Sequence, residues 1–405
     1  MSHKITCRQC GHVVNTFSEW FALGQTCPEC GCKHGEVTYD NNYDFLKELP
    51  GKEIDSFWHY FDVLPLENKE NIVSLCEGAV PIEEWDFLEQ FAKENGVDCK
   101  VYAYRNDLNG GTGTLKDVAA SLGASLFKEH GIKEYCVSST GNSATAFATY
   151  CAKAGVKFTN FAPNNITPDS VREIEKVGQK VVISTGNYGQ AKGEAADYAA
   201  KNNVLMSFGN FDPIRIEAKK TMVMEFLRQL GKMPDVYMQA VAGGTGPIAI
   251  DKGIREIAPY GDYKLPRMLL VQQDLCDPMV QAWEKAKANN FPEGYEKDFK
   301  AVDGSKTKVS ILNAANPGMY PLVAPIVKKS EGDFVRVLES ELPNFAAEVY
   351  RHKNAMIGPA GTVCLAGFYQ AIKENKIKQG ETVVINIGES SRRNAAFAEQ
   401  VKAVL

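Results

Sequence analysis

Apolar and polar positions along the chain predict a series of strand and helix units. After residue 100, short apolar runs are followed by longer segments in which apolar positions recur every three or four residues. The first units predict strands at 100–104, 135–138, 156–161 and 180–184, and helices at 116–130, 143–154, 168–177 and 188–202. Repeated units of this length indicate a mostly parallel sheet with helices on both faces.

A second set of units follows, with a long helix at 216–230, strands at 235–241 and 267–272, and further alternation to the C-terminus. Because no linker rich in Pro, Gly or Ser separates the two sets, we expect two doubly wound α/β lobes with a cleft at the carboxyl ends of their strands. The predicted parts, with interleaved lobes, are a ribbon at 1–40, an extension packing on the large lobe at 41–98, a small lobe at 99–210 and a large lobe at 211–405.

Paired cysteines near the N-terminus have the spacing of a four-cysteine zinc ribbon. Two pairs, each with two residues inside the pair and a glycine after it, are Cys7 with Cys10 and Cys27 with Cys30. Four protein ligands leave no open coordination position, so this zinc is expected to stabilise structure and to perform no chemistry. A ribbon that has lost its metal is the alternative, and Cys32 and His34 are spare ligands close by.

Composition and charge exclude several classes of protein. The 405 residues carry 45 basic and 50 acidic side chains, a net charge of -5, which gives no general reason to expect a nucleic-acid or anionic-membrane partner. No apolar run approaches the ~20 residues of a membrane span, and the first residues lack the apolar core of a secretory signal. A cytoplasmic location is therefore expected.

Three loops that each follow a predicted strand carry residues suited to chemistry. In the loop at 109–115, glycines and hydroxyls precede Lys116 and Asp117 at the start of a helix. The helix dipole and partial burial both favour the neutral amine that forms imines, although a surface lysine on a first turn is the simpler reading. The loops at 138–143 and 242–246 offer hydroxyls and bare backbone to an anion, and each alone could be an ordinary turn.

Matches to one known family run along almost the whole chain. The matching segments are 37–40, 57–60, 64–65, 73–78 with Pro81, 113–117, 139–142, 213–217 with Lys220 and Thr221, 243–246 and 359–361. In this order they resemble the zinc-ribbon branch of the threonine synthases, which includes cysteate synthase. The resemblance implies a fold-type II, tryptophan synthase β-like α/β enzyme that uses pyridoxal phosphate and assembles as a homodimer.

The resemblance also implies a role for each matching residue. Lys116 would bind the cofactor covalently and then move protons at the substrate, while the cofactor stores the electrons. The cofactor would otherwise be held by Asn142 at its phenolic oxygen, by Gly243, Gly244, Thr245 and Gly246 at its phosphate, and by Ser390. The implied substrate-binding residues are Thr114, Ser139, Thr140, Ser143 and Arg215.

Two departures from the family pattern concern the substrate and the cofactor nitrogen. Threonine synthases carry Ser-Phe-Lys-Asp-Arg around the lysine, whereas here Thr114 replaces the serine and Val118 the arginine, which removes a bidentate anion partner. The family's late Thr-Gly-His-Gly, which supplies a hydroxyl to the cofactor nitrogen, is Ile-Gly-Glu-Ser here, so Ser390 or Ser391 supplies that hydroxyl only if the loop is shifted. Candidate cations for a small anion are Arg105, Arg215, Lys219 and Lys220.

The favoured function is replacement or elimination at the β or γ carbon of an O-phosphorylated amino acid, threonine synthase-like with altered specificity. Two alternatives stay open within the same chemistry: phosphoserine plus sulfite, as in cysteate synthase, and an amino-acid dehydratase or ammonia-lyase. A binding protein built on an inactive fold is a third reading, which the presence of Lys116 disfavours.

Overall fold

The computed structural model describes residues 3–40 and 42–405, which separate into two compact units. Each unit is assembled from three stretches of chain. Unit 1 comprises Met1–Lys47, Glu53–Ala79 and Asn109–Thr221, and unit 2 comprises Glu48–Lys52, Val80–Leu108 and Met222–Leu405.

These units differ from the predicted boundaries at three places, and contacts between distant segments explain two of them. Strand β5 (Lys100–Tyr104) pairs in parallel with β13 (Thr382–Asn386), so it belongs to unit 2 and not to a lobe beginning at residue 99. Residues 53–79 belong to unit 1 and not to the larger unit. Helix α7 (Pro213–Lys220) packs on α3 (Lys116–Glu129), which brings residues 211–221 into unit 1 as well.

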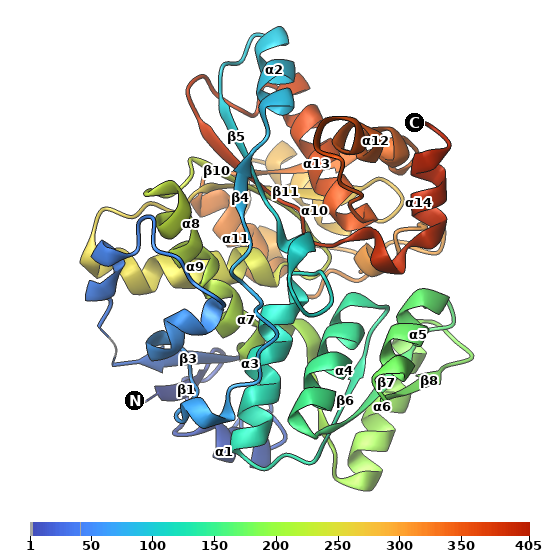
Figure 1. The fold of residues 1–405 in the computed structure, drawn as a ribbon. Helices are drawn as coiled ribbons and strands as arrows, with labels where there is room; N and C mark the ends of the chain where they lie inside the picture. The colour runs from blue at the N-terminus through green and yellow to red at the C-terminus, as the bar shows by residue number, and fades with distance from the viewer. Residues whose placement is uncertain (1–2, 41) are drawn as a thin grey trace. The chain divides into compact units, whose positions relative to one another are not determined.

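A parallel sheet organises most of unit 1 (Figure 1). Its strands, in spatial order, are β8 (Lys180–Ile183), β7 (Lys157–Ala162), β6 (Glu134–Ser138) and β9 (Leu205–Met206). Helix α3 packs on α4 (Asn142–Ala154) and α4 on α5 (Pro168–Lys176), while α6 (Tyr188–Asn202) packs on β6 and β7. The three strand and helix pairs predicted from 134 to 202 are therefore present, with ends shifted by one or two residues.

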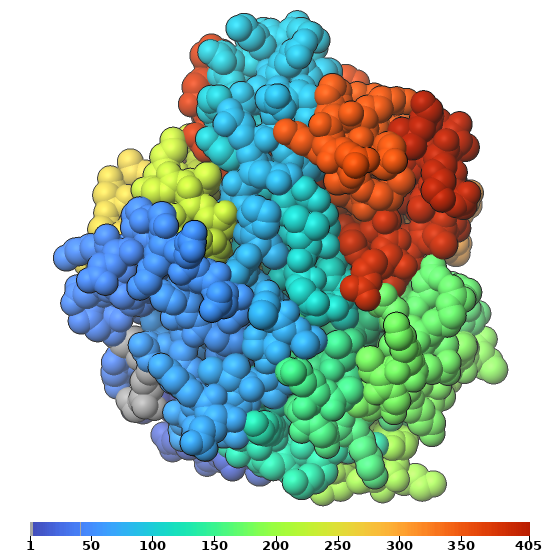
Figure 2. All heavy atoms as spheres, viewed as in Figure 1, coloured from blue at the N-terminus to red at the C-terminus, as the bar shows by residue number. Residues whose placement is uncertain are grey.

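The N-terminal part of unit 1 is a small antiparallel ribbon followed by a covering segment. The ribbon contains β1 (His3–Cys7), β2 (Val13–Val14), α1 (Phe17–Ala22) and β3 (Gly35–Tyr39), with β1 between the other strands. Further short helices are η1 (Asp44–Glu48), η2 (Phe57–Val63) and η3 (Lys69–Asn71). The Trp58 indole of η2 donates to the Ser121 hydroxyl of α3 at 2.8 Å. The covering segment, blue in Figure 2, therefore lies against α3, which is teal.

A larger sheet organises unit 2, with parallel strands apart from one antiparallel edge strand, β4. Its spatial order is β12 (Asp333–Val337), β11 (Arg267–Gln273), β10 (Val236–Ala240), β13, β5 and β4 (Ile82–Glu84). The helices of this unit are α2 (Asp86–Glu94), α8 (Met222–Leu230), α9 (Thr245–Ile257), α10 (Pro278–Ala288), α11 (Tyr320–Lys329), α12 (Leu342–Lys353), α13 (Pro359–Lys373) and α14 (Ala395–Lys402).

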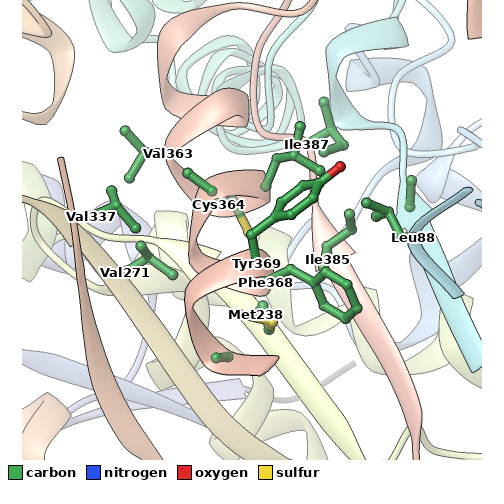
Figure 3. Packing of buried hydrophobic residues seen from close by; sticks show 14 of the residues in the cluster. Leu88, Met238, Val271, Val337, Val363, Cys364, Phe368, Tyr369, Ile385 and Ile387 are labelled. Carbon is green, nitrogen blue, oxygen red and sulfur yellow. The ribbon is translucent and has the colours of Figure 1, made fainter. Parts of the chain in front are cut away.

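Helix α13 forms the centre of the unit 2 core. Phe368 and Tyr369 of this helix point among apolar side chains from several strands and from α2, including Leu88 and Ile385 (Figure 3). The helix approaches β11 so closely that a Cβ atom on Gly367 would lie 2.4 Å from Val271 Cγ2. Close helix–sheet packing therefore requires glycine at position 367.

The single helix predicted at 216–230 is wrong, because the structure has two helices there, α7 and α8. The break is at Thr221, whose hydroxyl donates to the Ala218 carbonyl oxygen at 2.7 Å. Such a bond competes with the backbone hydrogen bonds that would continue the helix. No helix among residues 3–40 and 42–405 is long and apolar enough to cross a membrane.

We predict that Gly367→Ala lowers the free energy of unfolding by about 1–3 kcal/mol, because the added methyl group overlaps Val271. Gly193→Ala is the matched control, since Gly193 is an exposed residue of α6 with open space around its Cβ position. That change should raise stability by up to about 1 kcal/mol through helix propensity. Urea unfolding of both variants measures the difference, and equal effects would contradict the close packing.

Candidate active site

Lys116 is the first residue of α3 and is half-buried. Its backbone N–H donates to Thr114 Oγ1 at 3.0 Å, so the hydroxyl of the preceding loop caps the helix start at the lysine. The Thr114 side chain is itself fully buried. The loop and the first turn of α3 are therefore joined by a hydrogen bond, which fixes the backbone from which the Lys116 side chain extends.

A buried carboxylate next to Lys116 holds this loop in shape. Asp117 is fully buried, and its Oδ2 accepts the N–H groups of Thr112 and Thr114 at 2.9 and 3.1 Å. Its Oδ1 accepts the Thr112 hydroxyl at 2.7 Å. Three bonds to a charged acceptor, each worth about 1.5–3 kcal/mol, make the loop rigid in front of the lysine.

Two glycines in the same loop are required by close neighbours within unit 1. A Cβ atom on Gly110 would lie 2.1 Å from the Leu75 carbonyl oxygen, and one on Gly111 would lie 2.6 Å from the Tyr150 hydroxyl. The Tyr150 hydroxyl in turn donates to the buried Glu77 carboxylate at 2.7 Å. The lysine loop is thus packed between the 73–78 segment and α4.

The second predicted loop leads from β6 into the first turn of α4. Ser139, Thr140, Asn142 and Ser143 are all half-buried there. No side chain caps the start of this helix, where Gly141 is the N-cap residue. The first N–H groups of a helix have no partner inside the helix, which makes this turn suited to a carboxylate or a polar ring oxygen.

Arg215 links this turn to α7. Its side chain is 5% exposed, and its two terminal nitrogens donate to Ser143 Oγ at 2.9 Å and to Ser207 Oγ at 3.1 Å. The guanidinium also lies 5.2 Å from the centre of the Phe147 ring, while its Nε has no hydrogen-bond partner among the described residues. Two predicted substrate residues, Ser143 and Arg215, are therefore in direct contact.

Two further charged groups in unit 1 lie near Arg215. Lys219 is one helical turn further along α7 and is 1% exposed, and burial together with the charges of Lys116 and Arg215 lowers its pKa well below the ordinary value. Burial raises the pKa of Asp212 to about 6, against the opposing effect of Arg215. An anionic group bound beside Arg215 and Lys219 would favour the charged form of Lys219, so this part of unit 1 is suited to such a group.

The other two cation candidates are neutralised by carboxylates, so their prediction as anion-binding residues is corrected. Arg105 donates to both oxygens of Asp107 at 2.9 and 2.8 Å and to Glu83 at 2.5 Å. Lys220 pairs with Glu217 at 2.9 Å, and both side chains are fully buried. A cation that already balances a buried carboxylate has little attraction left for a substrate.

The third predicted loop connects β10 and α9 in unit 2. Gly244 is the N-cap residue of α9 with a φ of 76°, and a Cβ atom there would lie 2.5 Å from Val323 Cγ2. A Cβ atom on Gly246 would lie 2.0 Å from Gln239 Oε1. The loop thus presents backbone at a helix N-terminus, where N–H groups and the helix dipole favour a phosphate.

A chain of buried polar groups supports this loop from below. Tyr237 donates to Gln239 Oε1 at 2.9 Å, and Asn386 donates to the Tyr237 hydroxyl at 3.1 Å. Asn106 completes the chain by donating to Asn386 at 3.0 Å. Because Gln239 lies directly against Gly246, this network fixes the position of the glycine loop on the sheet.

The predicted Ser390 lies in the loop that follows β13. Its hydroxyl oxygen is buried and has no hydrogen-bond partner among the described residues, which leaves it suited to an outside acceptor such as a ring nitrogen. The preceding Glu389 is fully buried and accepts the Ala360 N–H of α13 at 2.8 Å. The glycine loop and this orphaned hydroxyl fit the phosphate and ring of pyridoxal phosphate.

The four paired cysteines gather in the ribbon of unit 1. Their sulfur atoms all lie within 4.8 Å of one another, with Cys7 3.6 Å from Cys30 and Cys10 3.5 Å from Cys27. These separations exceed a disulfide bond and suit a tetrahedral zinc ion, which keeps sulfurs about 3.8 Å apart. Cys32 and His34, the spare ligands of the sequence, lie outside this cluster.

Sequence reasoning missed several residues that the structure brings to these sites. Ser207 and Gln239 carry no local signal, because their partners Arg215 and Gly246 are seven or more residues away. Asp212 could have been found, since an aspartate before Pro213 is a typical helix start, and its Oδ1 accepts the Ile214 N–H at 3.0 Å.

Comparison with known proteins agrees with this geometry. A family model described as pyridoxal-phosphate dependent enzyme matches residues 73–388. Threonine synthase of Methanocaldococcus jannaschii is 27% identical over 383 residues, covering 89% of this chain and 90% of that protein. Threonine synthase of Methanosarcina acetivorans is 26% identical over 377 residues, covering 88% of this chain and 89% of that protein.

Among solved structures, threonine deaminase isoform 2 from Solanum lycopersicum has a TM-score of 0.65 at 18% identity, covering 88% of this chain and 97% of that chain. Maize serine racemase has a TM-score of 0.63 at 14% identity, covering 80% of this chain and 92% of that chain. The chain therefore belongs to the family of pyridoxal-phosphate-dependent enzymes, with a threonine synthase-like, fold-type II α/β fold.

Proposed function

We propose that this protein uses pyridoxal phosphate to catalyse replacement or elimination on an O-phosphorylated amino acid. The observation that carries the proposal is the buried Arg215, which hydrogen-bonds to neutral hydroxyls in the unit that also contains Lys116. A buried cation with hydroxyl partners suits a phosphate that arrives with the substrate. The similarity to curated threonine synthases supports the same class of reaction.

In this proposal the unit 1 residues bind the amino acid and move its protons. Lys116 Nζ would hold the cofactor, and its amine would take and return a proton at the substrate carbons. Ser139 and Thr140 hold the substrate carboxylate, while Ser143 and Arg215 hold the leaving phosphate. Asn142 donates to the phenolic oxygen of the cofactor.

The unit 2 residues orient the cofactor. When bound, pyridoxal phosphate withdraws electrons from the substrate carbon that loses its proton. Gly243, Gly244, Thr245 and Gly246 would hold its phosphate at the start of α9, and the Ser390 hydroxyl would be available to its ring nitrogen.

Substrate choice is proposed to differ from that of the threonine synthases. Val118 stands where the family carries arginine, and its side chain is 3% exposed, with Cγ1 3.3 Å from the position of a Cβ on Gly78. A packed valine supplies no donor to a phosphate, so Arg215 and Lys219 are left as the cations for it. This arrangement is also compatible with phosphoserine as the substrate and with an anionic nucleophile such as sulfite.

The cysteine cluster is proposed to bind one structural zinc ion. Burial would raise the pKa of Cys7, but hydrogen bonds from the Cys10 and Gln9 N–H groups lower it to about 6, which favours the thiolate that metals bind. A cytoplasmic location and a homodimeric assembly stay predictions from the sequence.

The first prediction concerns Lys116. The purified protein should show a visible absorbance band, and borohydride should attach the cofactor permanently to the peptide that contains Lys116. Lys116→Ala should abolish both the band and turnover with little change in unfolding temperature, because a half-buried side chain leaves no core cavity. Lys128→Ala, at an exposed position of the same helix, should keep the band. A colourless protein that pyridoxal phosphate cannot reconstitute would contradict the proposal.

The second prediction is one zinc ion per chain, held by Cys7, Cys10, Cys27 and Cys30. A thiol-reactive reagent should release it, and Cys27→Ser should lower both the zinc content and the unfolding temperature, because closed sites supply folding energy. Cys32→Ser is the matched control and should keep the metal. Atomic absorption on protein purified without chelator is the measurement, and a metal-free result would contradict the site.

The third prediction concerns the substrate. A missing guanidinium hydrogen bond is worth about 1.5–3 kcal/mol, so kcat/KM for phosphohomoserine should be at least about tenfold below that of an ordinary threonine synthase. Phosphate release from phosphohomoserine, and from phosphoserine with and without sulfite, measures the preference. Val118→Arg should raise phosphohomoserine turnover if the variant stays folded at its buried position. Threonine formation by the unmodified protein at about 10 per second would contradict the reading of Val118.

A further inference from the structure

The N-terminal ribbon contacts one short segment of unit 1, residues 206–220, at four separate points. Near the start of the segment, Gln25 Nε2 donates to the Met206 carbonyl oxygen at 2.9 Å. Further along, Lys33 Nζ lies 4.1 Å from the centre of the Phe208 ring, and the His34 ring meets the edge of Phe211 at 5.8 Å. At the far end, the Tyr39 hydroxyl donates to Glu217 Oε2 at 2.5 Å.

The last of these contacts completes a buried charged cluster. Glu217 Oε2 also forms an ion pair with Lys220 Nζ at 2.9 Å, and both charged side chains are fully buried. Lys220 Nζ lies over the Tyr39 ring at 3.9 Å, so a single ribbon side chain contacts both members of the pair. A buried ion pair is stable only when its remaining polar atoms are satisfied, which gives the Tyr39 hydroxyl more influence than a surface contact would have.

Segment 206–220 carries the groups proposed to receive the substrate phosphate. These groups are Arg215 and Lys219, and the segment also contains Ser207, whose hydroxyl accepts a hydrogen bond from Arg215. Arg215 reaches Ser143 of α4 from this segment, so the position of 206–220 decides whether guanidinium and hydroxyl meet at 2.9 Å. A shift of the segment by one ångström would break that bond.

The contacting residues follow directly from the sulfur cluster. Lys33 and His34 come three and four residues after Cys30, and the Cys27 N–H donates to the Cys32 carbonyl oxygen at 2.8 Å to close the turn between them. Tyr39 ends β3, which pairs with β1 so that Cys7 faces Gly35 and His3 faces Tyr39. Metal binding at the four sulfurs would therefore order the backbone from which three of the four contacts arise.

We infer that the ribbon holds segment 206–220 in place, with Tyr39 as a positioning residue that sets the affinity of the Arg215 region for an anion. The inference rests on the proposed function for the identity of that anion. Tyr39 touches neither substrate nor cofactor, and it acts through Glu217 and α7. The ribbon thus gains a role in substrate binding beyond the stability that a closed metal site supplies.

The test compares Tyr39→Phe with Tyr198→Phe in the holoenzyme. Tyr198 donates to Glu134 at 2.5 Å elsewhere in unit 1, so the control loses the same kind of bond at the same length. Hydrogen exchange of peptides covering 206–220 measures how well the backbone amides of this segment are protected, and it does not depend on activity. Calorimetric titration with inorganic phosphate measures the affinity of the proposed anion site, because in the holoenzyme the cofactor's own phosphate fills the glycine loop. Arg215→Gln is included to identify the heat that comes from the Arg215 site.

Tyr39→Phe should speed exchange of 206–220 several-fold and weaken phosphate binding about tenfold, with the visible cofactor band unchanged. Lys33→Met should move both readouts in the same direction by less, since it removes one exposed contact and keeps the fold. Tyr198→Phe should change neither. Unchanged exchange in Tyr39→Phe, or faster exchange with unchanged phosphate affinity, would overturn the inference. A wild-type protein without the cofactor band would contradict the proposed function separately, while the exchange comparison still decides whether the ribbon holds the segment.

Discussion

The carboxylate of Asp117 accepts hydrogen bonds from two backbone N–H groups and one hydroxyl of the loop that precedes Lys116. Because this carboxylate is fully buried, losing one of these bonds would remove part of the compensation for its removal from water. The loop therefore has one shape, and Gly110 and Gly111 are there because their neighbours leave no room for a side chain. A rigid loop of this kind suits the role proposed for Lys116, because it fixes the position of the lysine backbone.

The buried cations Arg105, Lys220 and Arg215 differ in their partners, and this difference supports the proposed position of the anion. Arg105 and Lys220 are matched by carboxylates at hydrogen-bond distance, which makes them parts of the structure. Arg215 instead donates to serine hydroxyls, and burial together with the charges of Lys116 and Arg215 lowers the pKa of the neighbouring Lys219. A phosphate dianion bound beside Arg215 would favour the charged form of Lys219, which is why this region is proposed for the substrate phosphate.

In the role inferred for the ribbon, a structural element that holds no reacting group affects substrate binding. Its sulfur cluster has no place for a reacting ligand, yet its contacts run along the whole of segment 206–220. A loss of metal would then act on substrate affinity before it acted on the covalent attachment at Lys116, because the lysine loop has its own support from Asp117.

Local pattern in the sequence determined the helices and strands of 134–202, the cysteine pairs, the lysine loop and the glycine loop. Each of these depends on residues within about fifteen positions, so periodicity and spacing report them directly. Tertiary structure alone decided that β5 joins β13 across some 280 residues, that Thr221 divides the predicted long helix, and which cations are neutralised. A sequence shows that a side chain will be buried or charged, but its partner is chosen by packing between distant segments, and that choice separated Arg215 from Lys220 although they lie five residues apart on one helix.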